Sequence, residues 1–112
     1  MRNIKTTTKD KVEVYKSTAA LVEAMFTEIK ELAKKKPDST MNEIKVKMVN
    51  RLLSDVKGFL SDEPVAKYLD LLSDDDLPQY SDALLLMSQY SAAMKEFRSN
   101  YFDIRNSHWK TS

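Results

Sequence analysis

The feature that most constrains this fold is an apolar stripe in the C-terminal third of the chain, where hydrophobic residues recur three and four positions apart. Its members are Tyr80, Ala83, Met87, Tyr90, Met94, Phe97, Tyr101 and Ile104. This spacing places all of these side chains on one face of an α-helix. The stripe is widened by Leu84, Leu85, Leu86 and Ala93, so other elements must cover the helix on more than one side. The pattern predicts a helix over residues 77–105, which at ~1.5 Å per residue would be about 43 Å long.

Two further stripes with the same spacing predict helices over residues 8–36 and 40–60. One of the threonines 6–8 is expected to cap the first helix, and Pro37 is expected to end it. The second helix is expected to begin with the capping box Thr40-Met41-Asn42-Glu43, in which the hydroxyl and the carboxylate each bind an unpaired backbone N–H. The first stripe consists of Val12, Tyr15, Ala19, Val22, Phe26, Ile29 and Ala33, with Leu21, Met25 and Leu32 beside it. The second consists of Met41, Ile44, Met48, Leu52, Val56 and Phe59.

A short helix over residues 63–72 is predicted between the second and the last helix. Pro64 is tolerated in a first helical turn, and the acidic residues before it suit the positive end of the helix dipole. The aspartates 74–76, which precede Pro78, are interpreted in the same way, as the start of the last helix.

The composition supports a helical fold. The 112 residues include a single glycine, whereas β-hairpins and sandwiches normally use several in their turns. Short connections make successive helices antiparallel neighbours. We therefore expect an all-α fold, an antiparallel helical bundle of three long helices plus one short crossing helix. It should form a single helical domain over residues 1–112, with polar tails at 1–7 and 106–112.

The sequence offers no sign of a membrane or secreted protein. No apolar run approaches the roughly 18 residues of a membrane span. Residues 1–11 are polar and charged and lack the apolar core of a secretion signal. The chain has no cysteine, which excludes disulfides and thiolate metal sites. A cytoplasmic location is the expectation.

Few residues suit catalysis or metal binding. His108 is the only histidine and lies in the polar tail, where no Glu-x-x-His pair is formed. The aspartates 74–76 provide oxygen ligands for Mg²⁺ or Ca²⁺, but EF-hand spacing is absent and helix capping explains them better. No general acid–base pair, nucleophile or phosphate-binding loop is found. We expect no enzymatic activity, no metal and no cofactor.

The charge is divided along the chain. Residues 1–60 carry 13 Lys and Arg against 8 Asp and Glu, a net charge of +5, whereas residues 61–112 carry 5 against 9, a net charge of −4. Such polarity affects association rather than fold. The acidic candidates for a partner surface are Asp62, Glu63, Asp70, Asp74 and Asp75. The candidate phosphate contacts are Lys34, Lys35, Lys36, Lys47 and Arg51, with Lys30 beside them. They leave a nucleic-acid-associated regulator as the alternative function.

The length of the last helix predicts self-association. A compact domain of this size is about 34 Å across, which is shorter than the expected helix. Part of its stripe would then lack cover within one chain. We expect a homodimer that buries this seam on both copies, through Tyr90, Met94, Phe97 and Tyr101, whose residue types are enriched at interfaces. The competing explanation is that the C-terminal tail covers the helix, with Trp109 folded back.

The favoured function is non-enzymatic binding of another protein. The chain is similar, in size and class alone, to small helical immunity, antitoxin and inhibitor proteins. We expect a small helical protein-interaction module that acts as an adaptor, inhibitor or regulator.

Overall fold

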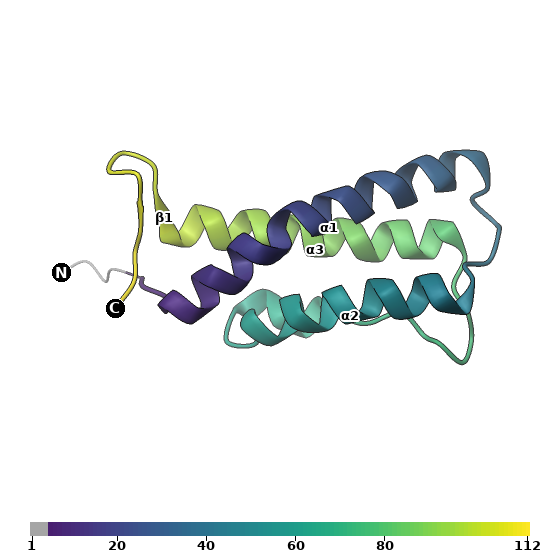
Figure 1. Cartoon of the computed structure of the whole chain (residues 1–112), viewed down its shortest axis with the longest axis horizontal. Coiled ribbons are helices and arrows are strands. Elements are labelled where there is room, and N and C mark those ends of the chain that lie inside the picture. The colour runs from purple at the N-terminus through teal and green to yellow at the C-terminus, as the bar shows by residue number, and fades with distance from the viewer. Residues whose placement is uncertain (1–4) are drawn as a thin grey trace.

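The computed structural model describes residues 5–112 and shows three helices packed together, with a small antiparallel sheet at one end (Figure 1). The elements in chain order are α1 (Lys9–Lys35), α2 (Glu43–Phe59), the 3₁₀-helix η1 (Pro64–Tyr68), α3 (Tyr80–Tyr101), β1 (Phe102–Asp103) and β2 (His108–Trp109). The molecule is elongated, with extents of 51 × 25 × 23 Å. None of the helices described between residues 5 and 112 is long and apolar enough to span a bilayer.

The first helix forms where the sequence predicts it. The Thr8 hydroxyl caps α1 by accepting a hydrogen bond from the Lys11 backbone N–H at 3.2 Å. Asp10 lies in the first turn and Lys34 and Lys35 lie in the last, where their charges suit the helix dipole. The cap and the boundary before Pro37 are therefore confirmed.

The second helix begins later than predicted, and the capping residue is different. Asn42 caps α2 by accepting a hydrogen bond from the Lys45 backbone N–H at 2.8 Å. Thr40 instead pairs with Gln79 in an isolated antiparallel bridge. The Met41 N–H also donates to the Pro78 carbonyl at 2.8 Å. The backbone at Thr40 is thus committed to the segment before α3, and the predicted capping box is wrong.

The predicted helix over 63–72 is also wrong in its extent. Only Pro64–Tyr68 is helical, and it forms a 3₁₀-helix. Residues 69–79 run without helix or named strand to the start of α3. The aspartates 74–76 do not cap a helix, because they lie in a bend that is closed by a hydrogen bond from the Asp76 N–H to the Ser73 hydroxyl. Helix α3 begins instead after Gln79, which makes no side-chain capping bond.

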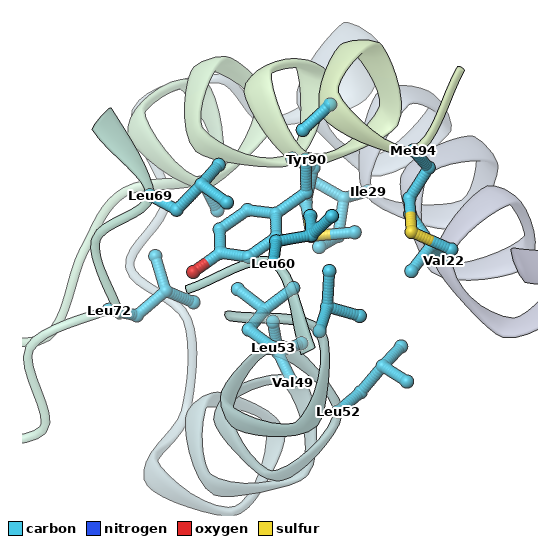
Figure 2. Close-up of a cluster of buried hydrophobic side chains, with 14 of the residues drawn as sticks. Val22, Ile29, Val49, Leu52, Leu53, Leu60, Leu69, Leu72, Tyr90 and Met94 are labelled. Atoms are coloured by element: carbon cyan, nitrogen blue, oxygen red, sulfur yellow. The ribbon is translucent and has the colours of Figure 1, made fainter. Parts of the chain in front are cut away.

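Two leucines hold this non-helical connection against the core. Leu69 and Leu72 are buried, and Figure 2 shows them beside the Tyr90 ring, on the side of the cluster away from α1. The side chain of Asn50, on α2, fixes the backbone at Leu72 from both sides. Its amide donates to the Leu72 carbonyl at 2.8 Å and accepts from the Leu72 N–H at 2.9 Å. This pairing satisfies both backbone polar groups of Leu72, the N–H and the carbonyl, where the connection passes along the core.

Tyr90 completes the centre of the core. Its ring is fully buried, and its hydroxyl donates to the Asp70 carbonyl at 2.8 Å. Burial raises the pKa of the Tyr90 phenol to about 12, and the nearby Asp70 adds to the shift. The tyrosine therefore fastens the connection to α3 only while the phenol is protonated.

We expect Tyr90 to make the fold sensitive to alkali. Because the folded pKa exceeds the unfolded pKa, the stabilisation is complete below about pH 10 and is lost as the pH rises to about 12. The free energy of unfolding should fall by at most about 3 kcal/mol over this range. Urea denaturation at a series of pH values measures it, and Tyr90→Phe should reduce the slope. The exposed Tyr68→Phe is the control, and an equal slope in wild type and Tyr90→Phe would contradict this role.

The chain after α3 folds back as a β-hairpin rather than extending as helix. Helix α3 ends at Tyr101, four residues before the predicted boundary, and β1 pairs with β2. The last residues then pair with the chain before α1, since the Thr7 N–H donates to the Lys110 carbonyl at 2.9 Å and the Ser112 N–H to the Thr7 carbonyl at 3.1 Å. We call Thr7 together with residues 102–112 the terminal clasp.

Candidate functional site

The best-defined hollow in the structure lies between α1 and α2, near the end of the bundle opposite the terminal clasp. It has a volume of about 160 Å³ and is mostly apolar. Its lining comes from α1, the start of α2 and the start of α3: Met25, Glu28, Ile29, Leu32, Met41, Lys45, Met48, Val49 and Tyr80. We call this hollow the α1–α2 groove.

The helix period explains how these residues come together. Met25 and Leu32 lie beside the buried stripe of α1, on the side that faces α2. Met48 has the equivalent place on α2, one residue before the buried Val49. Side chains at the edges of two packed stripes line a groove rather than fill a core, and three of those here are methionines, which adapt to irregular surfaces.

A hydrogen-bonded pair of polar side chains lines part of this apolar groove. Tyr80 is buried, and its hydroxyl lies 3.2 Å from the Lys45 ammonium. The same ammonium lies 5.7 Å from the Tyr80 ring centroid, within the range of a cation–π contact. Lys45 is therefore held in the lining of the groove by a residue of α3.

The rim of the groove exposes large apolar side chains. Ile44 is 72% exposed, Met48 is 51% exposed and Leu21, further along α1, is 53% exposed. Ile44 and Met48 also border a shallow depression with Lys47 and Arg51. Exposed apolar groups that gather around a hollow, with charged residues at its border, are typical of a binding surface.

The predicted acidic residues do not form one compact patch. Asp62 and Glu63 lie just after α2, whereas Asp74 and Asp75 lie near the start of α3, so they are separated by most of the connection. Asp62 forms an ion pair with Lys11 at 2.8 Å, and this bond lowers the pKa of its carboxyl. Glu63 accepts a hydrogen bond from the Tyr101 hydroxyl at 3.0 Å. Asp62 and Glu63 thus have contacts within the chain. The fifth acidic candidate, Asp70, is exposed.

Four of the five candidate phosphate contacts lie towards the groove end of the bundle, and Arg51 lies at the middle of α2. Lysines 34–36 end α1, while Lys47 lies in the first half of α2, and all five are exposed. Two of them are paired, because Lys34 lies 3.4 Å from Glu31 and Lys47 lies 3.0 Å from Glu43. The bond to Glu43 raises the pKa of Lys47.

The residues predicted to form a dimer seam are covered by the chain itself. The side chains of Tyr90, Met94, Phe97 and Tyr101 are all buried. Trp109, in the terminal clasp, lies 5.9 Å from the Phe97 ring. The prediction that this seam lacks cover within one chain is therefore wrong, and the competing arrangement, with Trp109 folded back, is the one observed. Whether the chain forms a dimer through another face stays a prediction.

Most groove residues belong to the predicted helical stripes or lie beside them, but the sequence did not predict that they form a site. The signal was present, because Leu21, Met25 and Leu32 widen the α1 stripe beyond what one neighbouring helix covers. Among residues 5–112, no group of three or more His, Asp or Glu is arranged to hold a metal ion. No protein-family model, curated protein or solved structure matches this chain.

Proposed function

We propose that this chain is a non-enzymatic protein-interaction module that binds a partner protein in the α1–α2 groove. An adaptor, an inhibitor or a regulator of the immunity and antitoxin kind would act in this way. The observation that carries the proposal is the apolar groove of about 160 Å³ beside the exposed Ile44 and Met48. A surface of this kind is costly to leave in water and is stabilised when a partner covers it.

The shape of the groove favours a helix as the bound element. Two antiparallel helices present a long furrow, and an amphipathic helix can insert apolar residues spaced three and four apart into such a furrow. Lys45, Lys47 and Arg51 along the α2 side would attract acidic residues on the polar face of that helix. Met25 and Met48 can change rotamer to fit the inserted side chains.

The second candidate is a nucleic-acid-associated regulator. The observation in its favour is that Lys34, Lys35, Lys36 and Lys47 lie towards the same end of the bundle, with Arg51 one turn further along α2. It is less favoured, because Lys34 and Lys47 already have acidic partners and the chain as a whole carries a net charge of only +1.

Site-specific photo-crosslinking tests the proposed docking surface. A photoreactive amino acid at Ile44, on the groove rim, should capture a discrete partner in cells that naturally contain this chain. The same amino acid at Leu85, which is 66% exposed on α3, is the matched control and should not. The captured protein, once purified, should bind wild type and lose at least about tenfold in affinity with Met48→Glu, which places a charge in the apolar groove.

Two outcomes would contradict the proposal. Equal capture from Ile44 and Leu85 would show no preference for the groove, and unchanged affinity with Met48→Glu would place the contact elsewhere. Salt-dependent binding to generic DNA or RNA, weakened when lysines 34–36 are replaced by glutamine, would favour the second candidate instead.

A further inference from the structure

The surface that contains the groove continues along both helices as a seam of hollows. Next to the α1–α2 groove is the depression bordered by Ile44, Lys47, Met48 and Arg51. A third and wider hollow lies where the start of α1 meets the end of α2, lined by Asp10, Lys11, Val14, Ser17, Thr18, Asp55, Gly58 and Phe59. We call the whole seam the α1–α2 face. Leu21, 53% exposed, lies on α1 between the first and third hollows along the sequence.

The charge of the α1–α2 face changes sign along its length. The half near the start of α2 carries the cations Lys45, Lys47 and Arg51, and its excess charge stays positive although Glu28 lines the groove and Glu43 pairs with Lys47. The half near the end of α2 carries Asp10 and Asp55 together with Lys11, which forms an ion pair with Asp62 just beyond it, so its excess charge is negative. The boundary between the halves lies on α2 between Arg51 and Asp55, which are one helical turn apart and both exposed.

A face with opposite charges at its two ends complements itself. In a twofold dimer each surface meets an identical surface that is rotated by 180°. If the axis passes through the middle of the face, the basic half of one copy lies over the acidic half of the other. A face with a single sign of charge would repel its own copy, whereas this arrangement pairs unlike charges twice.

We propose that the α1–α2 face binds a second copy of this chain, with the α2 helices antiparallel and Leu21, Met25 and Met48 at the centre of the contact. This inference rests on the proposed function in one respect, that the groove is a docking surface. It adds that a second copy of the chain occupies this surface when no other partner is bound. In this dimer the α1 and α2 helices of one copy pack on those of the other copy, as two layers of two helices. Helix α3 lies on the outer side of each layer.

The size of the face predicts a weak, reversible dimer. Helix α2 has 17 residues and is therefore about 26 Å long, and two packed helices are about 18 Å wide. The projected footprint is roughly 470 Å² on each copy, which suggests an interface at the small end of those found in specific complexes. We expect a dissociation constant in the range of about 1–100 µM, which is typical of a small reversible contact, with the apolar centre contributing more to it than the area does.

Sedimentation equilibrium over a range of concentrations tests the dimer. Wild type should approach twice the monomer mass of 12.9 kDa as the concentration rises to about 200 µM. Met48→Glu should raise the dissociation constant at least about tenfold, because it places a charge at the apolar centre. Leu85→Glu adds the same charge at an exposed site on α3 and should leave the dissociation constant unchanged. Circular dichroism verifies that both variants are folded.

Charge reversal tests the antiparallel arrangement. In the antiparallel arrangement Arg51 of one copy faces Asp55 of the other. Arg51→Asp places two acidic side chains opposite each other and Asp55→Arg places two basic ones, so each substitution should weaken the dimer. Mixing these two variants should restore dimers, and so should combining both substitutions in one chain, which only exchanges the two signs. High salt should weaken the wild-type dimer.

The outcomes separate this inference from the proposed function. A monomer at about 200 µM overturns the inference, and a dimer that is insensitive to Met48→Glu or not restored by mixing the charge variants also overturns it. If a partner is captured at Ile44 and wild type is monomeric, the proposed function is supported and the dimer is excluded. If Met48→Glu disrupts the dimer and no other protein is captured at Ile44, the dimer is supported and binding of a different partner protein in the groove is contradicted.

Discussion

Phe97→Ala is expected to lower the free energy of unfolding by about 3–5 kcal/mol, the range for truncating a buried aromatic residue. Phe97 is 1% exposed, and its ring centroid lies 5.6 Å from that of Tyr15, 5.1 Å from Phe59 and 4.9 Å from Tyr101. These rings come from α1, α2 and α3, so one truncation leaves a cavity where all three helices meet. Urea denaturation at neutral pH measures the loss.

Leu85→Ala is the matched control on the same helix. Leu85 is 66% exposed, so its truncation should change the free energy of unfolding by no more than about 0.5 kcal/mol. A loss below about 1 kcal/mol for Phe97→Ala would show that this aromatic cluster is not packed as described.

Trp109→Ala is expected to lower the free energy of unfolding by about 2–3 kcal/mol. This loss is smaller than that for Phe97→Ala because the indole is only half-buried. The ring centroid of Trp109 lies 5.1 Å from that of Tyr15 and 5.2 Å from that of Phe102. The indole thus joins the terminal clasp to α1 and to the end of α3. Its loss should also release the hydrogen bond from the Thr7 N–H to the Lys110 carbonyl.

Two measurements separate loss of the clasp from general loss of stability. Urea denaturation gives the free energy, and hydrogen exchange gives the protection of the Thr7 and Lys110 amides, which should fall in Trp109→Ala while amides in the middle of α3 stay protected. Ile104→Ala truncates a side chain that is 74% exposed in the same hairpin and should preserve the clasp. Unchanged exchange at Thr7 in Trp109→Ala would mean that backbone pairing alone holds the clasp.

Prediction from the sequence succeeded where local signals determined the structure. The helix period and the Thr8 cap defined α1, because each acts within a few residues along the chain. The helices α2 and α3 were predicted, but their boundaries were placed too far out. Thr40 and Gln79, which flank these helices, pair with each other across the fold, and no local pattern reports such a pairing.

The connection after α2 shows why the rest was not predictable. Residues 63–72 have apolar spacing that suits a helix, yet Leu69 and Leu72 are buried by an extended chain. The extended form is held by Asn50, whose partner Leu72 is 22 positions away. The end of α3 has a similar cause, since Phe102 leaves the helix to pair with Trp109. In both places tertiary contacts override local propensity.

The candidate site was predictable in part. The acidic and basic residues could be named from the sequence, and four of the basic ones lie towards one end of the bundle, while their role in binding stays a prediction. For the dimer seam the sequence left two explanations open, and the one with Trp109 folded back is the one observed, because Tyr15, Phe59 and Trp109 pack around Phe97. The groove could not be located, because its lining combines residues of α1, α2 and the start of α3, which only the packing of the three helices brings together.

The terminal clasp has a consequence for the order in which the molecule folds and opens. It joins Thr7 to Thr111, the pairing with the greatest sequence separation among the backbone bridges described. Contacts that close such long loops form late, after the helices have packed, and a pairing of only a few residues at the edge of a fold opens at low cost. We therefore expect one end of the rod to fluctuate by partial unfolding while the other stays closed. The groove lies at the closed end, so a binding surface there keeps its shape while the clasp opens and reforms.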